Sequence, residues 1–222
     1  MNFTTHEEEY RSKELLDKIK GANIIVCGCG AIGSNLIDNL LRQGFEDITV
    51  IDFDRIEDHN RGTQIWESRE VGSLKTESMK RRAFVVSKTD LKSVPKKLTK
   101  ENTKKFLSTG KDITIVIDTF DNSDSRRLLY NFCKDNHYNG NQEILCLHAG
   151  LFQDYAEIIW NEAYNVPNDP TGPDVCEYPL ARNIILLCVA VTSEVLIRYI
   201  DKGVMDNYMI TLKDLRISLK DI

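Results

Sequence analysis

The chain has 222 residues, 41% of them hydrophobic, and a formal net charge of −5. This length predicts one domain, spanning residues 1–222, with a proper core, and the negative charge argues against a general nucleic-acid binder. Residues 1–20 are highly charged, which argues against a secretory signal, and six cysteines without an evident pairing pattern fit a reducing cytoplasm.

The first predicted elements flank a glycine-rich turn. A charged stretch from residue 6 to residue 20 predicts a leading helix, and the apolar run 23–27 is typical of a buried strand. Gly28, Gly30 and Gly33 follow as G-x-G-x-x-G, and helical spacing then continues to about residue 43. Such a turn lets a phosphate approach the backbone and the helix N-terminus. It therefore predicts a nucleotide site; the alternative is that the glycines serve only tight packing.

A second predicted strand, residues 48–53, carries Asp52 at its carboxyl end. This carboxylate can accept hydrogen bonds from ribose hydroxyl groups. Up to this point the pattern also suits an NAD-dependent oxidoreductase. Such an enzyme gives no reason for the polar set that follows, which comprises Asp54, Asn60, Arg61, Gln64 and Lys75.

A third predicted strand begins at residue 115 and ends in Asp118 and Asp121, at the edge where α/β sheets bind ligands. Lys75 and an arginine can hold phosphate oxygens, and Asp121 can hold Mg²⁺, which prefers one or two carboxylates with phosphates and water. Two plainer interpretations stay open. Lys75 can be a solvated helix lysine, and Asp121 can be the N-cap of a helix predicted at 123–136.

The order of these motifs resembles the ThiF/MoeB/HesA superfamily, the adenylating fold of sulfur-carrier activators and ubiquitin-activating enzymes. The resemblance covers about residues 10 to 200. It is carried by the motifs GCGAIG (28–33), DFD (52–54), NRGTQ (60–64), GSLK (72–75) and DTFDN (118–122).

This resemblance implies roles for individual residues. Asp52, with Asp54 beside it, would bind the nucleotide through the ribose, and Asn60 and Gln64 would line the phosphate site. Lys75 would neutralise the triphosphate, and Asp121 would coordinate Mg²⁺. Members also lend an arginine near the N-terminus across a homodimer, and Arg11 is the candidate here. The alternative for Arg11 is a surface arginine on the leading helix.

One position departs from the family pattern. Thr63 stands where members have arginine before glutamine, and the nearest arginine is Arg61, two positions earlier. Arg61, helped by Gly62, is therefore the candidate for the same phosphates. If it cannot reach them, catalysis is impaired or another residue supplies the charge.

The resemblance also implies attack of a C-terminal carboxylate on the α-phosphate of ATP, followed in some members by a thioester on a cysteine. Cys176 is the candidate because it precedes Pro179 and a long predicted helix at 184–200, and a helix start lowers a thiol pKa, although Glu177 opposes this. The other five cysteines are expected to be buried. No C-x-x-C pair exists, so no structural zinc is expected. His148 is expected to be a satisfied core histidine.

The remaining pattern completes an α/β, Rossmann-like fold in which a parallel doubly wound half continues into a mixed sheet with antiparallel strands. Further strands are expected at 144–148 and 155–160, and a hairpin at 209–219. The helix at 184–200 is expected in the core and not in a membrane, because charged residues interrupt it. The basic stretch 92–105 is interpreted as a solvated connection, and the loop 162–176 is long enough to be mobile.

The sequence therefore predicts an ATP- and Mg²⁺-dependent adenylyltransferase, a cytoplasmic homodimer acting on the C-terminus of a small ubiquitin-like or sulfur-carrier-like protein. Rivals are an enzyme that adenylates a peptide or another carboxylate without a cysteine step, a non-catalytic partner subunit, and an NAD-dependent oxidoreductase. Thr63 favours the partner subunit, whereas Lys75 and Asp121 oppose it. No membrane or nucleic-acid partner is expected.

Overall fold

A single mixed sheet organises the chain in the computed structural model, which describes residues 3–139, 142–161, 163–168 and 182–220. The sheet has nine strands in the order β3-β2-β1-β4-β6-β7-β8-β9, and β5 pairs with β6. The strands are β1 Asn23–Cys27, β2 Asp47–Ile51, β3 Lys92–Val94, β4 Ile113–Asp118, β5 Tyr138–Asn139, β6 Gln142–Phe152, β7 Tyr155–Trp160, β8 Tyr208–Thr211 and β9 Arg216–Leu219.

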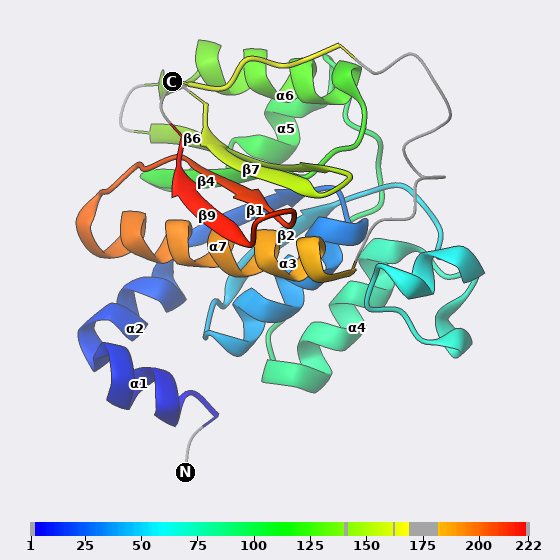
Figure 1. The fold of residues 1–222 in the computed structure, drawn as a ribbon, viewed down its shortest axis with the longest axis horizontal. Coiled ribbons are helices and arrows are strands. Elements are labelled where there is room, and N and C mark those ends of the chain that lie inside the picture. Colours follow the sequence, from blue (N-terminus) through cyan, green and yellow to red (C-terminus); the bar gives the residue numbers. More distant parts are fainter. Residues whose placement is uncertain (1–2, 140–141, 162, 169–181, 221–222) are drawn as a thin grey trace.

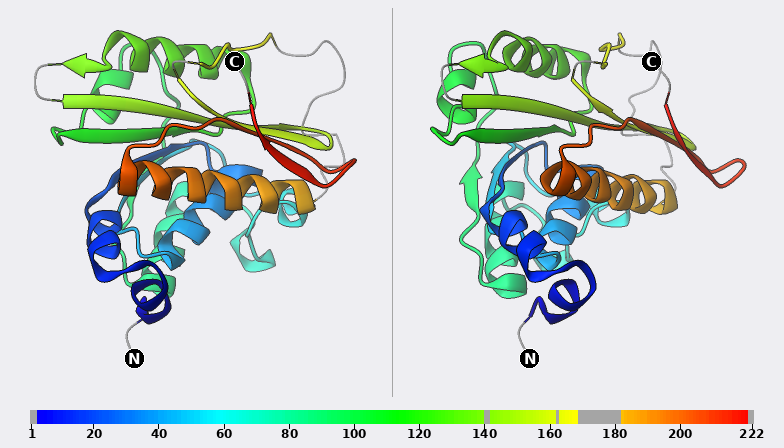
Figure 2. Two further views of the ribbon diagram at one scale, coloured as in Figure 1. Left: turned by 60° about the vertical axis from the view of Figure 1, so that its left-hand side comes forward. Right: turned by 90° about the vertical axis from the view of Figure 1, so that its left-hand side faces the viewer.

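Helices cover both faces of this sheet (Figures 1 and 2). α5 and α6 lie on one face, while α3, α4 and α7 lie on the other (Figure 1). The helices are α1 Thr5–Arg11, α2 Lys13–Gly21, α3 Ala31–Arg42, α4 Lys75–Ser87, α5 Thr103–Leu107, α6 Ser123–Asp135 and α7 Arg182–Lys202, with short 3-10 helices η1 Asp58–Gly62 and η2 Ser68–Glu70.

The sheet changes character along β6. The strands from β3 to β4 pair in parallel, and β4 pairs in parallel with residues 143–148 of β6. Residues 147–152 of β6 then pair antiparallel with β7, and β7, β8 and β9 follow as antiparallel neighbours. The predicted fold is confirmed, including the terminal hairpin of β8 and β9.

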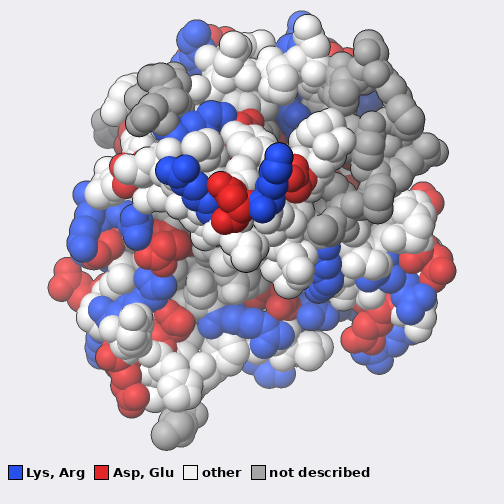
Figure 3. Space-filling model, viewed as in Figure 1, with Lys and Arg blue, Asp and Glu red and all other residues white. Residues whose placement is uncertain are grey.

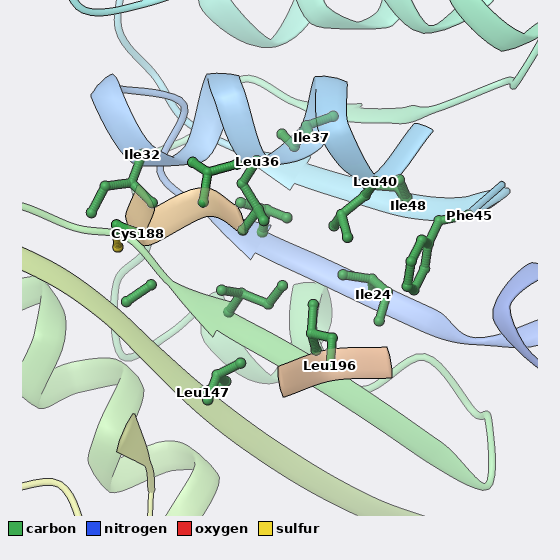
Figure 4. Close-up of a cluster of buried hydrophobic side chains, with 14 of the residues drawn as sticks. Ile24, Ile32, Leu36, Ile37, Leu40, Phe45, Ile48, Leu147, Cys188 and Leu196 are labelled. Carbon is green, nitrogen blue, oxygen red and sulfur yellow. The ribbon is translucent and has the colours of Figure 1, made fainter. Parts of the chain in front are cut away.

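Two hydrophobic clusters follow from the alternation of side chains along the strands. Ile24 of β1 joins the larger cluster under α3 and α7, whereas its neighbour Ile25 joins the smaller cluster under α5 and α6. In Figure 4 the α3 side chains Leu36 and Leu40 face the sheet, and Leu196 of α7 belongs to the same cluster.

α7 is long and apolar enough to cross a membrane by length and composition alone. Half of its most apolar window is nevertheless buried in the fold, where residues such as Ile185 and Leu196 join the larger cluster. It is the core helix that the sequence predicts.

Three sequence expectations are wrong in detail. The leading helix is broken into α1 and α2 at Ser12, whose φ is 131° and whose hydroxyl caps α2 by accepting the N–H of Leu15. The basic stretch at 92–105 is not merely a solvated connection, because it contains edge strand β3 and helix α5. The expected strand ending at His148 continues to Phe152. An edge strand has one solvated side, which explains why β3, with its exposed Lys92, resembled a loop.

Two of the three motif glycines are required by packing. A Cβ on Gly33 would lie 2.1 Å from the carbonyl oxygen of Gly28, and a Cβ on Gly28, where φ is +103°, would lie 2.7 Å from Oγ1 of Thr119. Tight packing therefore explains Gly28 and Gly33. It does not explain Gly30, because a Cβ there meets nothing within 4 Å.

This contrast predicts different outcomes for two alanine substitutions. Gly33→Ala is expected to cost about 2 kcal/mol or more, or roughly 6 °C in Tm, because backbone must move. Gly30→Ala should change Tm far less and serves as the matched control. Thermal unfolding followed by circular dichroism measures both, and equal Tm values for the two variants would contradict the packing argument.

Candidate active site

Three strand ends meet at the carboxyl edge of the parallel half. Cys27 at the end of β1 is in register with Ile51 of β2 and with Asp118 of β4. The glycine turn, Asp52 and the 118–122 turn therefore follow directly from neighbouring strands. This edge is where open α/β sheets bind ligands.

Asp52 ties the second strand to the glycine turn. Its Oδ2 accepts a hydrogen bond from the backbone N–H of Cys29 at 2.6 Å, and its Oδ1 accepts one from Asp54 N–H at 2.7 Å. Burial raises the pKa of Asp52 above its usual value, although Lys75 and these two N–H groups act to lower it. Each carboxylate oxygen can accept a second hydrogen bond, so the position remains suited to a ribose.

Lys75, at the start of α4, is only 7% exposed. Its Nζ lies 3.2 Å from Oδ2 of Asp54, and its backbone N–H donates to the Asp54 carbonyl oxygen at 3.0 Å. Burial acts to lower the pKa of Lys75, but the charges of Asp52 and Asp54 outweigh it and raise the pKa above the usual value. The interpretation as a solvated lysine is wrong, because the ammonium is buried and the two carboxylates favour its charged form.

The 60–64 segment is joined to the glycine turn through Asn35, a residue outside all of the sequence motifs. Asn35 Nδ2 donates to the carbonyl oxygens of Ala31 at 2.7 Å and of Thr63 at 2.9 Å. Its only signal in the sequence is that a polar amide stands among the buried residues of α3. Helical spacing alone does not predict what such an amide binds.

Asn60 and Gln64 shape the same segment from within. Asn60 accepts the N–H of Glu57 through Oδ1 and the N–H of Gln64 through its carbonyl oxygen. Gln64 is buried, and its Oε1 accepts a hydrogen bond from the indole N–H of Trp66 at 2.5 Å. Among the described residues, no hydrogen bond uses the amide nitrogen of Gln64, so this group can donate to a ligand.

A cleft of about 610 Å³ lies beside this segment, between α3 and the start of α7. It brings together Arg61 and Gln64 with two further arginines, Arg82 and Arg182. Arg61 is 41% exposed and pairs with Asp58 at 2.6 Å, and Arg82 pairs with Asp38 at 2.7 Å. In Figure 3 positive and negative side chains are interspersed over the visible described surface.

Asp121 lies in the turn after β4 and is exposed. Its Oδ1 accepts a hydrogen bond from Nδ2 of Asn122 at 3.2 Å. The N-cap of α6 is Asn122, whose Oδ1 accepts the N–H of Ser125 at 2.9 Å, so the alternative interpretation of Asp121 as the cap is wrong. Thr119 attaches this turn to the glycine turn, because its hydroxyl donates to the carbonyl oxygens of Cys27 and Gly28.

The structure does not bring Arg11 to these residues within the chain. Its guanidinium pairs with Glu7 at 3.1 Å and with Glu194 of α7 at 2.9 Å. The pKa of Arg11 is raised, since these carboxylates outweigh the lowering effect of burial.

Of the predicted thiols, Cys176 lies outside the described residues, with Pro179 and Glu177. The other five cysteines are buried, as expected. Burial raises the pKa of Cys27, Cys29 and Cys188, and a hydrogen bond with Cys133, together with burial, raises the pKa of Cys146. These four are therefore protonated, unreactive thiols at neutral pH. Among the described residues, no group of three or more His, Cys, Asp or Glu side chains could hold a metal ion.

A sequence model of the ThiF family matches residues 6–163. The chain belongs to the ThiF family. This match confirms the adenylating family that the order of motifs predicts.

Individual relatives match over shorter stretches. The tRNA threonylcarbamoyladenosine dehydratase of Haemophilus influenzae is 32% identical over 126 residues, 56% of this chain and 48% of that protein. SUMO-activating enzyme subunit 2 of Dictyostelium discoideum is 32% identical over 77 residues, 34% of this chain and 12% of that protein. The chain thus matches less than half the length of these relatives.

Solved structures of this ThiF-family fold cover nearly all of the chain. The Escherichia coli MccB structure with MccA-N7isoASN has a TM-score of 0.75 at 20% identity, and the match covers 97% of this chain and 69% of MccB. The MccB structure with ATP has a TM-score of 0.72 at 19% identity over the same shares. These likenesses establish the fold.

The buried ion pair predicts a pH-dependent loss of stability for Lys75→Met. About 2 kcal/mol is expected at about pH 7, because the variant leaves Asp52 buried without its cation, while Asp54 is half-exposed. The loss should shrink as the pH falls, since Asp52 has a raised pKa and takes up a proton first, which removes the charge that Lys75 balances.

Urea unfolding at neutral and acidic pH measures this difference. Lys80→Met on the same helix is the matched control, because the ion pair of Lys80 with Asp90 is largely exposed and should contribute well under 1 kcal/mol. Equal losses for the two variants, or a Lys75→Met loss that grows in acid, would contradict the assignment.

Proposed function

We propose that the chain adenylates the C-terminal carboxylate of a small protein or peptide, using ATP and Mg²⁺. The carboxylate oxygen would form a bond to the α-phosphorus of ATP, and the bond to pyrophosphate, the leaving group, would break. The observation that carries the proposal is the buried Lys75 beside Asp52, next to the glycine turn at the start of α3.

The glycine turn fits a nucleotide on a structural criterion. Gly30 is the only one of the three motif glycines with no packing need, so its absent side chain leaves the backbone at the start of α3 approachable. The first N–H groups of a helix have no partner within it and favour an anion. Asp52 would hold the ribose, and Lys75 would neutralise phosphate charge.

Mg²⁺ fits the exposed carboxylate of Asp121, because this ion takes one or two carboxylates and otherwise binds water and phosphate oxygens. When bound, it would supply the positive charge that a triphosphate needs. Asn60 and Gln64 would line the phosphates, and Arg61 would reach them by exchanging its exposed partner Asp58. An exposed pair of this kind costs little to break.

A polypeptide terminus is the proposed substrate because the fold matches MccB, solved with MccA, along nearly the whole chain. The relative that acts on tRNA supports a second candidate, a carboxylate carried by RNA. The net charge of −5 and the interspersed charges on the face in Figure 3 favour the polypeptide.

Two further parts of the proposal concern assembly and location. A cytoplasmic homodimer would let Arg11 of one chain contact ATP in the other, provided that it leaves Glu194 and Glu7. The arginine fork matches phosphate oxygens and keeps its charge. Cys176 would accept the acyl group as a thioester, with AMP as the leaving group.

Calorimetric titration with ATP tests the nucleotide site without knowledge of the substrate. Mg²⁺ is expected to strengthen ATP binding, and Asp121→Ala is expected to remove this effect. Asp124→Ala, three residues further on and 99% exposed in its side chain, is the matched control and should behave as wild type. Wild-type protein that binds NADH in place of ATP would support the oxidoreductase, and protein that binds neither would support the partner subunit.

Product formation with a cognate carrier tests the cysteine step. Cys176→Ala is expected to retain pyrophosphate release and to lose the covalent, thiol-sensitive complex on a non-reducing gel. Cys133→Ala is the control, because that thiol is buried. Full final product formation by Cys176→Ala would remove the thioester from the proposal.

A further inference from the structure

We infer that His148 is a positioning residue for Asp121: it holds Asp118 and thereby orients the turn that presents the Asp121 carboxylate. This inference rests on the proposed function, because it assigns His148 a role in Mg²⁺-dependent ATP binding. It concerns a buried histidine that the family motifs do not include.

The pair of Asp118 and His148 is built into the sheet. The two residues are register partners on β4 and β6, and each is 2% exposed. Nδ1 of His148 lies 3.0 Å from Oδ2 of Asp118. An ionised carboxylate only accepts hydrogen bonds, so Nδ1 carries the proton when Asp118 is ionised.

The imidazole ring is fixed on its other sides as well. The ring of Tyr164 stacks on it with centroids 3.9 Å apart and planes 11° apart. Gly150 makes room for it, because a Cβ there would lie 2.4 Å from Nε2. His148 therefore has one orientation in which to meet Asp118, as expected of an outer residue that holds a ligand in place.

Glu157 faces the second ring nitrogen, with Oε1 3.9 Å from Nε2. Burial acts to raise the pKa of Glu157, but Lys220 and the hydroxyl of Tyr155 outweigh it and hold the pKa below its usual value. Carboxylates therefore face both ring nitrogens of His148. Only Asp118, the carboxylate at Nδ1, leads directly into the turn that contains Asp121.

The connection from Asp118 to Asp121 is short. Oδ1 of Asp118 accepts the backbone N–H of Phe120 at 3.1 Å, and the Phe120 carbonyl oxygen accepts Nε of Arg126 at 2.8 Å. Thr119 attaches the same turn to the glycine turn. Phe120, the residue immediately before Asp121, is therefore held through both its N–H and its carbonyl oxygen, and the first of these hydrogen bonds depends on the orientation of Asp118.

Removing the hydrogen bond that His148 donates to Asp118 should weaken Mg²⁺ binding at Asp121, because this turn connects the two carboxylates. A buried Asp118 with one partner missing would rotate or draw in water, since unpaired buried polar groups are costly. Removing such an outer residue weakens metal binding by about 10- to 100-fold in proteins with resident metals. The first-turn N–H groups of α3 and Lys75 do not depend on this pair, so ATP binding without Mg²⁺ should be unchanged.

Two amide substitutions separate positioning from packing. In His148→Asn the side-chain N–H₂ stands near the place of Nδ1 and can still donate to Asp118. In His148→Gln it stands near Nε2 and faces Glu157. The Mg²⁺ concentration for half-maximal strengthening of ATP binding should rise about 10-fold in His148→Gln and stay close to wild type in His148→Asn. His148→Leu should behave as His148→Gln.

The controls distinguish a positioning role of His148 from a general destabilisation of the fold and from failure of the proposed function. His137→Gln, near the opposite end of β6, should leave the Mg²⁺ requirement unchanged. Equal Mg²⁺ requirements in wild type, His148→Gln and His148→Asn would overturn the positioning role, as would weaker ATP binding without Mg²⁺. If His148→Leu does not fold, the two amide variants still decide. Wild-type protein lacking Mg²⁺-dependent ATP binding would overturn the proposed function and this inference together.

Discussion

The close approach of Thr119 to Gly28 and Gly33 is the contact on which the candidate site depends. It places the turn after β4 directly against the turn after β1, leaving no room for a Cβ at either glycine. Because the Thr119 hydroxyl also donates to two backbone carbonyl oxygens of the β1 turn, the contact is polar as well as steric. Asp52 adds the end of β2 through Cys29 N–H, so three strand ends act as one rigid unit.

The charges already present in this unit determine how much additional positive charge a phosphate ligand would need. Lys75 interacts with the charges of both Asp52 and Asp54, so its ammonium alone can offset only part of the charge of a triphosphate. Under the proposed function the remainder would come from the start of α3, from Mg²⁺ and from arginines. Arg61, Arg82 and Arg182 line one cleft beside Gln64. Three arginines therefore lie in or next to the 60–64 segment, although Thr63 replaces the arginine of the family pattern.

The sequence predicts the parts of the fold that depend on local pattern. The apolar run of β1 is continuous, the apolar residues of α3 recur at helical spacing, and β8 and β9 alternate; the structure places all three as expected. Prediction from the sequence fails where a contact between residues distant in the chain determines the structure. The short strand β3, which pairs with β2, and the role of Asn35, which donates to Thr63, depend on neighbours that are remote in the chain. The pairing of His148 with Asp118 likewise requires the order of strands in the sheet.

β6 has a consequence for the folding and opening of the whole molecule. It is the strand shared by both halves, because β4 binds its first part in parallel and β7 binds its second part antiparallel. The amide hydrogens of its central residues are covered by neighbours on both sides, so solvent reaches them only when the two halves separate. Slow hydrogen exchange is therefore expected to be concentrated in β6, which would report the global free energy of unfolding.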